Sequence, residues 1–201
     1  MSKSFGLLVR SLPVMFALTL SACGGGPPPK LYLLQLPAVE INDVDVSSIS
    51  QLGISQVTVP GYANDARIAS RSGSGVVEQL DRQRWAEEPE EAITRLLSKR
   101  LKARAEATVL IEPWPRDYEP QARIEVMFDT LLREPDGGAH IAGQIQLLSG
   151  DGRRLLQAVP FEYRIKSRTT DTTAFFSSVA RGVDEIARDA IDAMLSVRRS
   201  S

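Results

Sequence analysis

Cys23 is the residue best suited to chemistry in this sequence, and it is the chain's single cysteine. Leu20, Ser21 and Ala22 precede it, at the end of a short apolar run that has a basic start. Small residues before a cysteine in this setting are what a bacterial lipoprotein signal peptidase cleaves, and they let a diacylglyceryl transferase modify the thiol. The spacing therefore predicts cleavage between Ala22 and Cys23 and attachment of lipid to the Cys23 sulfur.

The residues before Cys23 are typical of a secretory signal peptide. Lys3 and Arg10 are basic, no acidic residue accompanies them, and an apolar stretch follows over residues 11–20. About ten apolar residues are too few to cross a bilayer as a helix, which takes roughly 20. We therefore expect residues 1–22 to be removed. An ordinary secretory signal with a chance cysteine is the alternative, but no second cysteine exists as a disulfide partner for Cys23.

The anchor also predicts a location. Bacterial lipoproteins normally carry several acyl chains, palmitate among them, and two or more chains hold a protein stably to a membrane. An aspartate directly after the cysteine usually retains lipoproteins in the inner membrane, whereas Gly24 stands here. We expect the periplasmic face of the outer membrane. Residues 23–30, rich in glycine and then in proline, form a tether with a reach of roughly 20 Å.

Little else in the sequence is suited to catalysis. His140 is the single histidine, which excludes most metal sites and most acid–base schemes built on imidazole. The alternation around His140 predicts a solvent-exposed strand residue. A nucleophile elbow over residues 72–75 would need a glycine where Arg71 stands, so a flexible turn is expected there.

A group of carboxylates precedes the first predicted helix: Glu87, Glu88, Glu90 and Glu91. Paired carboxylates can hydrolyse glycosides or bind a cation, but several of them at one helix start more often complement the helix dipole. We therefore predict no enzyme activity, no cofactor and no metal. An envelope hydrolase is the least supported alternative.

Two tryptophans lie in predicted loops. Trp85 follows Arg84 just before a helix, and Trp114 lies among prolines with Tyr118 nearby. Either these rings close the edges of the core, or they anchor a protein partner or an acyl chain. Tryptophan and tyrosine are favoured where apolar burial meets water, so both interpretations stay open.

The first half of the chain predicts short strands around one helix. The predicted strands are residues 31–36, 54–59, 67–70, 76–80 and 108–111, and residues 38–50 are expected to form a loop. Pro89 opens the helix, where a proline costs no hydrogen bond. The apolar stripe along this helix is Ile93, Leu96, Leu97 and Leu101.

The second half predicts a meander and a helix. Residues 123–132, 141–147 and 155–165 alternate and are joined by tight glycine turns, so they are expected to be antiparallel neighbours with one face on the core. Thr172 or Thr173 is expected to cap the last helix. The apolar stripe of that helix is Phe176, Val179, Val183, Ile186, Ala190 and Met194.

These elements predict one α+β domain over residues 31–197. It has a mixed sheet with a C-terminal antiparallel meander and two main helices packed on it. Two associated halves joined at residues 113–120 are the alternative. The hydrophobic share of 43% excludes a disordered chain. Without Lys3 and Arg10, 22 basic residues face 25 acidic ones, a balance that gives no support for nucleic-acid binding.

Several stretches match a known family in order and spacing. They are the lipobox ending at Cys23, residues 31–34 with Pro37, residues 57–62 followed by 67–71, residues 84–95, Pro113 with Trp114, and residues 124–129. Together they resemble the ABC-type transport auxiliary lipoproteins, closest to the paraquat-inducible protein C type. The sequence departs from the family at Leu31, where the family often has a second tyrosine, and in the acidic insert 40–50.

The resemblance implies an outer-membrane lipoprotein without catalysis, cofactor or metal. It would work with a mammalian-cell-entry (MCE) type periplasmic protein and its permease complex in lipid transport between the two membranes. An auxiliary lipoprotein of another ABC exporter and a structural envelope-assembly lipoprotein are the alternatives. Symmetric partners favour a homo-oligomer. Aromatic residues and arginine are enriched at interfaces, so the candidate partner surface is Tyr62, Arg67, Arg71, Trp85 and Trp114.

Overall fold

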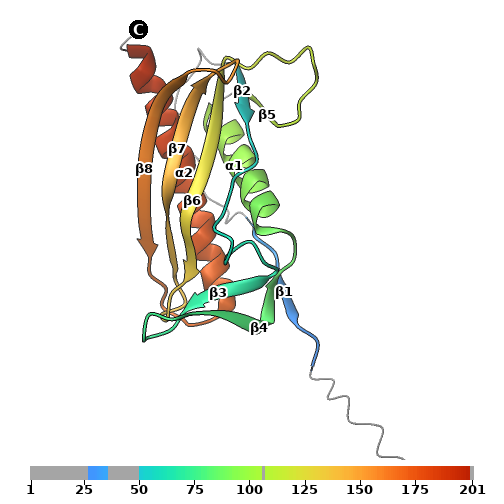
Figure 1. Ribbon diagram of the computed structural model, residues 1–201, viewed down its shortest axis with the longest axis vertical. Helices are drawn as coiled ribbons and strands as arrows, with labels where there is room; N and C mark the ends of the chain where they lie inside the picture. Colours follow the sequence, from blue (N-terminus) through green and yellow to red (C-terminus); the bar gives the residue numbers. More distant parts are fainter. Residues whose placement is uncertain (1–26, 36–49, 106, 200–201) are drawn as a thin grey trace, which may run out of the picture.

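The computed structural model describes residues 27–35, 50–105 and 107–199, which form one α+β domain (Figure 1). In chain order the elements are β1 (Lys30–Tyr32), β2 (Gln51–Ile54), β3 (Arg67–Arg71), β4 (Val77–Trp85), α1 (Pro89–Ala105), β5 (Thr108–Ile111), β6 (Ala122–Arg133), β7 (Ala139–Ser149), β8 (Leu155–Ile165) and α2 (Thr172–Arg199). The predicted cleavage site, Cys23 and nearly all of the predicted loop 38–50 lie outside the described residues.

The meander β6–β7–β8 is the largest part of the sheet. β6 pairs antiparallel with β7 from Ala122 opposite Ser149 to Arg133 opposite Ala139, and β7 pairs antiparallel with β8. Alternate residues of β6 enter the core, where Ile124 and Val126 are buried, while Met127 is exposed on the other face. The three predicted meander strands are therefore confirmed.

Three segments from the first half of the chain lie along the edge of β6 that faces away from β7. β2 runs parallel to its start, Thr58 forms a single bridge to Met127, and Ser70 of β3 pairs with Arg133 at its end. β5 extends the sheet beyond β2, whereas β4 and then β1 extend it beyond β3. All eight strands therefore belong to one mixed sheet.

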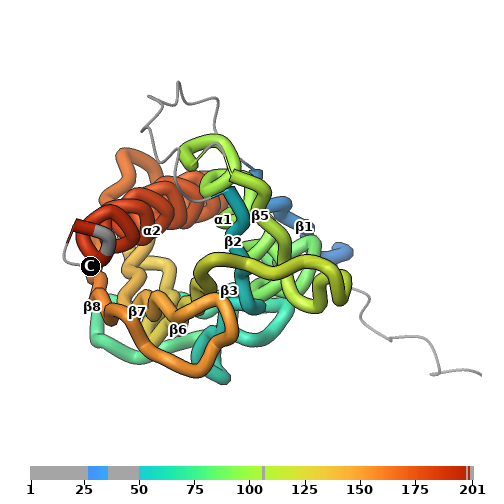
Figure 2. Tube along the Cα trace, turned by 90° about the horizontal axis from the view of Figure 1, so that it is seen from above, coloured from blue at the N-terminus to red at the C-terminus, as the bar shows by residue number. Residues whose placement is uncertain are grey.

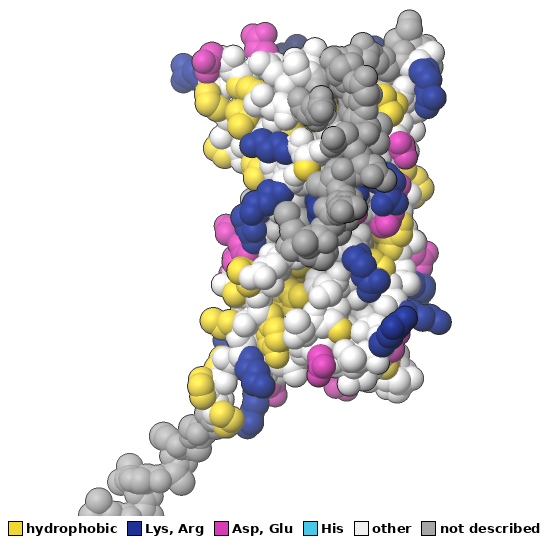
Figure 3. Space-filling model, turned by 180° about the vertical axis from the view of Figure 1, so that it is seen from behind, with side chains coloured by type: hydrophobic (Ala, Val, Ile, Leu, Met, Phe, Trp, Pro, Cys, Tyr) yellow, Lys and Arg dark blue, Asp and Glu magenta, His cyan; other side chains and the backbone are white. Residues whose placement is uncertain are grey.

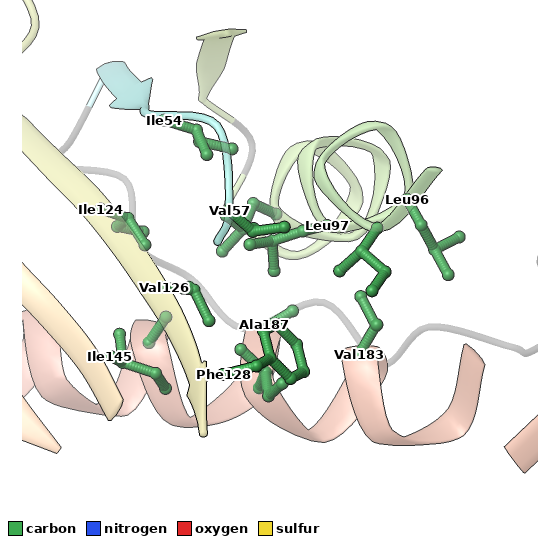
Figure 4. Close-up of a cluster of buried hydrophobic side chains, with 14 of the residues drawn as sticks. Ile54, Val57, Leu96, Leu97, Ile124, Val126, Phe128, Ile145, Val183 and Ala187 are labelled. Carbon is green, nitrogen blue, oxygen red and sulfur yellow. The ribbon is translucent and has the colours of Figure 1, made fainter. Parts of the chain in front are cut away.

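Both helices lie on one side of the β6–β8 meander (Figure 2). The predicted stripes are buried: Leu96 and Leu97 of α1 and Val183 of α2 are at most 1% exposed. Figure 4 shows Val183 and Ala187 of α2 facing α1 and the core side of β6. The core is therefore the space between the two helices and one face of the sheet, as the sequence predicts.

The predicted strand 54–59 is wrong. β2 ends at Ile54, because the following N–H groups turn alternately to the sheet and to α1. Thr58 N–H donates to the Val126 carbonyl at 3.1 Å, whereas Val57 N–H donates to Thr94 Oγ1 and Val59 N–H to Glu90 Oε1, both at 3.0 Å. Residues 55–59 thus connect α1 to the sheet.

Three smaller differences concern element ends. β1 ends at Tyr32, so the predicted strand 31–36 is too long, whereas β4 continues to Trp85. Thr172 is the first residue of α2, and its hydroxyl contacts the Gln83 side chain of β4. Its side chain therefore connects α2 to the hairpin that β3 and β4 form.

The alternative of two halves joined at residues 113–120 is also wrong. β2 and β3 from the first half pair with β6 from the second. α1 packs against α2, with Arg104 of α1 bound to Asp184 of α2. The two halves therefore share one sheet and one core.

Candidate functional site

The side chain of Tyr62, which precedes β3, forms hydrogen bonds with the backbone of β6. Its hydroxyl lies 3.4 Å from the Asp129 carbonyl and accepts from the Leu131 N–H at 3.4 Å. Asp129 is the extra residue at the register shift of β6 between Phe128 and Thr130, and a β-bulge leaves such a residue unpaired in the ladder with β7. The phenol of Tyr62 therefore forms hydrogen bonds with the backbone at the bulge, and the residue is half-buried.

The two arginines of β3 take part in ion pairs. Arg67 Nε lies 3.1 Å from Asp65 Oδ1, and Arg71 Nε lies 3.2 Å from Glu134 Oε1. The hydrogen bond from Arg67 lowers the pKa of the Asp65 carboxyl below its ordinary value. Both guanidinium groups stay partly exposed and can contact a partner at their free edges.

Trp85 lies in the core, so the structure removes it from the candidate surface. The residue is 4% exposed. Its ring lies edge-on to two rings of α2, with 4.6 Å between the ring centroids for Phe176 and 6.0 Å for Phe175. The ring of Tyr32 of β1 also stacks on Phe176, with 5.5 Å between the ring centroids. This aromatic cluster fastens the ends of β1 and β4 to the first turns of α2, which is the edge-of-core interpretation.

Trp114 lies at the opposite end of the molecule, in the connection from β5 to β6 (Figure 1). The Arg123 guanidinium lies 4.9 Å from the centre of its ring, in cation–π geometry. Tyr118 contacts the same ring, and its hydroxyl lies 2.9 Å from the Leu52 carbonyl. Burial raises the pKa of Tyr118. The half-buried Trp114 therefore holds the loop in place, while Pro113 and its neighbours are exposed.

The structure thus brings together only part of the candidate surface. Tyr62, Arg67 and Arg71 gather around β3, Trp114 lies at the far end, and Trp85 is buried. The sequence could not separate these positions, because the two tryptophans have similar local contexts and only the tertiary packing differs.

His140 contradicts its predicted exposure. It is only 6% exposed, with Nε2 at 3.1 Å from Glu162 Oε1 and Nδ1 at 3.7 Å from Glu134 Oε1. Glu134 also binds Arg71 of β3, and Glu162 also binds Arg164. The hydrogen bond from Arg164, followed by that from His140, lowers the pKa of Glu162. The surrounding side chains come from β3, β8 and the turn after β6, so the alternation of β7 could not reveal this environment.

A buried charge cluster joins the two helices, and sequence reasoning missed it. Arg104 Nη2 lies 2.8 Å from both carboxylate oxygens of Asp184, and Arg100 Nε lies 3.2 Å from Oδ1. The two arginine side chains are 8% and 3% exposed. Their spacing of four residues, next to the apolar stripe of α1, is the signal that could have pointed to it. This cluster is structural, because it closes the helix interface.

Two members of the predicted carboxylate group at the start of α1 bind within the fold, whereas Glu88 and Glu91 are exposed. Glu87 binds Arg95, and Glu90 accepts from the backbone of residue 59. Among residues 27–35, 50–105 and 107–199, no three His, Cys, Asp or Glu side chains are grouped so that they could hold a metal ion. None of the helices in this part of the chain is long and apolar enough to cross a membrane.

One pocket of the described residues has a volume of about 300 Å³ and lies at the end of the domain that carries β1, the tether end. It is lined by side chains of both charges, including Glu134, Asp136, Arg164 and Lys166. A second pocket of about 170 Å³ lies beside α1. Neither contains the nucleophile–base arrangement of a hydrolase.

Two solved structures share this fold. A crystal structure of an uncharacterized protein has 16% identity and a TM-score of 0.66, covering 87% of this chain and 100% of its own. A Xanthomonas campestris protein of the DUF330 family has 13% identity and a TM-score of 0.65, covering 85% of this chain and 98% of its own. No curated protein matches the chain.

One family model matches most of the sequence. It describes the ABC-type transport auxiliary lipoprotein component and covers residues 32–190. The matched span begins at the last residue of β1 and ends within α2, so it contains β2 to β8 and α1 whole. The chain therefore belongs to the ABC-type transport auxiliary lipoprotein component family.

Proposed function

We propose that this protein is a lipid-anchored auxiliary component that docks an MCE-type periplasmic protein in lipid transport between two membranes. The family match over residues 32–190 is the observation that carries this proposal. The resemblance of the sequence to paraquat-inducible protein C types supports the more specific choice of an MCE partner.

The proposed location is the periplasmic face of the outer membrane. The proposal rests on the predicted cleavage after Ala22, on the predicted acylation of Cys23 with palmitate among the chains, and on Gly24 in place of an aspartate. Several acyl chains hold a protein stably at a membrane, so the folded domain needs no further anchor.

The proposed contribution is binding, without catalysis. Three of the side chains that looked reactive in the sequence, Glu87, Glu90 and His140, are bound within the fold. What the molecule offers a partner is a rigid domain on a tether. Its cofactor requirement is proposed to be none.

The proposed docking surface is the end that carries Trp114. The tether enters at the opposite end, so a partner that reaches the protein from the periplasm meets the connection between β5 and β6 first (Figure 1). Pro113, Pro115 and Arg116 are exposed there, and Trp114 and Arg123 make the loop rigid. A rigid loop docks without a large ordering cost. Tyr62, Arg67 and Arg71 at the tether end are the alternative surface.

Crosslinking in intact cells tests both surfaces. A photoreactive amino acid is placed at Arg116, at Arg67, or at Arg188 on the exposed side of α2 as a matched control. The expected result is a crosslink to an MCE-type protein from position 116 and none from position 188. A crosslink from position 67 alone would move the docking surface to β3, and crosslinks only to another exporter would replace the MCE system.

The anchor is tested separately by Cys23→Ala. Mass spectrometry is expected to show acylated wild type and an unacylated, soluble variant. A variant that still floats with membranes would contradict the anchor.

A further inference from the structure

We infer that the tether end of the domain rests on the lipid surface that carries the anchor, with the tip of the β3–β4 hairpin in contact with lipid. This inference rests on the proposed acylation of Cys23. It goes beyond that proposal, because an anchor alone does not fix how the domain is oriented on the membrane.

The hairpin and the tether occupy the same end of the molecule. β4 lies across that end in Figure 1, with the hairpin turn at one side and β1 at the other. Tyr32 of β1 pairs with Trp85 at the end of β4, while Val77 is the first residue of β4. Nine residues of strand span about 30 Å, so the two sides form a broad base.

The tether is shorter than the domain. Lys30 is the seventh residue after Cys23, which limits their distance to about 25 Å. α2 has 28 residues and runs nearly the length of the domain, about 42 Å. The opposite end therefore lies beyond the reach of the anchored cysteine, and the base is the part of the domain held close to the bilayer.

The base exposes large apolar side chains at both of its sides. Leu31 and Leu33 are 66% and 49% exposed beside the tether, and Val76 and Val77 are 55% and 42% exposed at the hairpin. Figure 3 shows hydrophobic side chains where the chain enters this end. Single exposed apolar residues need no explanation, but apolar groups at two sides of an end held against a bilayer can enter its interfacial region.

Charge does not oppose this contact. The exposed charges of β1, of the hairpin and of the connections 134–138 and 166–171 balance each other. They are Lys30, Arg82, Lys166 and Arg168 against Glu78, Asp81, Asp136 and Asp171. We therefore expect contact with zwitterionic lipid that changes little with salt.

Site-specific labelling tests the orientation in the acylated full-length protein. Acylation blocks the native thiol, so Leu31→Cys, Val76→Cys and Leu155→Cys each provide one free thiol for an environment-sensitive fluorophore. Leu155 is the matched control, because it is 53% exposed, close to the 55% of Val76, and starts β8 at the opposite end. Each labelled protein is bound to phosphatidylcholine vesicles with and without a quencher on the lipid chains.

The expected result is blue-shifted emission and quenching at positions 31 and 76 and neither effect at position 155. Quenching at position 31 with none at position 76 would overturn the inference while leaving the anchor intact, since position 31 lies next to the tether. Equal quenching at positions 76 and 155 would also overturn it, because it would mean a domain that tumbles or lies flat. A protein that does not float with vesicles at all would instead refute the anchor and the inference together.

Discussion

Asp184 provides the negative charge between two arginines at the helix interface. Arg100 and Arg104 of α1 are almost fully buried against its carboxylate. A buried ion pair adds little net stability over an apolar packing, but loss of one partner leaves the others uncompensated. The contribution that we expect from this cluster is to fix how α1 packs on α2.

The variant Asp184→Ala is therefore expected to lower the free energy of unfolding by about 3–5 kcal/mol, because two buried arginines lose their carboxylate. Urea unfolding measures the loss. Arg188→Ala is the control, since its side chain is 47% exposed and its ion pairs, one of them a 3.9 Å contact with the same Asp184 carboxylate, are expected to contribute less than about 1 kcal/mol. A variant Asp184→Ala as stable as Arg188→Ala would show that the cluster tolerates an unpaired charge.

Gly53 is required by the approach of Trp114. A Cβ at position 53 would lie 2.9 Å from Cη2 of the Trp114 ring. We expect Gly53→Ala to destabilise the protein by about 1–3 kcal/mol and to change the tryptophan fluorescence, because the ring must move. At Gly61 a Cβ would meet nothing within 4 Å, so Gly61→Ala is the control. Unchanged fluorescence in Gly53→Ala would argue against a fixed Trp114.

Asp65 reports the ion pair of Arg67. Its lowered pKa means that the pair stabilises the fold above the ordinary carboxyl pKa, and that this contribution is lost as the pH falls through the folded value. In Arg67→Gln the pKa of Asp65 is expected to rise toward its ordinary value, which an NMR titration of the carboxyl measures. If this pKa did not move, another group would be responsible for lowering it.

At the scale of elements, the aromatic cluster is the link between the hairpin and α2. Trp85 and Tyr32 pack on Phe176, and the Thr172 hydroxyl contacts Gln83. These contacts fix β1 and β4, which otherwise form the outer strands beyond β3. The hairpin keeps its place at the base through them.

Trp85→Ala is expected to cost about 3–5 kcal/mol, because it opens a cavity beneath the hairpin. Amide exchange should accelerate first in β1 and β4 and least in β7, which has a paired strand on each side. Phe161→Ala, which removes another buried ring but from β8, serves as the comparison. Equal acceleration in all strands would indicate that the hairpin unfolds only with the whole domain.

At the scale of the whole molecule, the shared edge of β6 makes the two halves inseparable. Residues 27–112 contain β2 and β3, whose partner strand β6 lies in residues 113–199. Each fragment alone is therefore expected to be unfolded, and a mixture of the two to regain dispersed NMR signals. A folded spectrum from residues 27–112 alone would contradict the single core.

Periodicity alone determined the elements that depend on one amphipathic face. The stripes of α1 and α2 and the alternation of the meander were correct, because burial on one side leaves its pattern in consecutive residues. Periodicity gave a wrong prediction for residues 55–59, because the side chains of Thr94 and Glu90 of α1 accept hydrogen bonds from two of their N–H groups. A strand-like pattern cannot show which partner the backbone will find.

The candidate site divides in the same way. Motif and spacing alone were enough to predict Cys23 as the lipid site and to indicate the family. A signal peptidase recognises consecutive residues, and a family resemblance is likewise a match of residues in order along the chain. Only the tertiary structure decided that Trp85 is a core residue, that His140 is enclosed by Glu134 and Glu162, and that Trp114 lies far from Arg67. Exposure and proximity depend on segments that are distant in sequence, and no local pattern encodes which of them will meet.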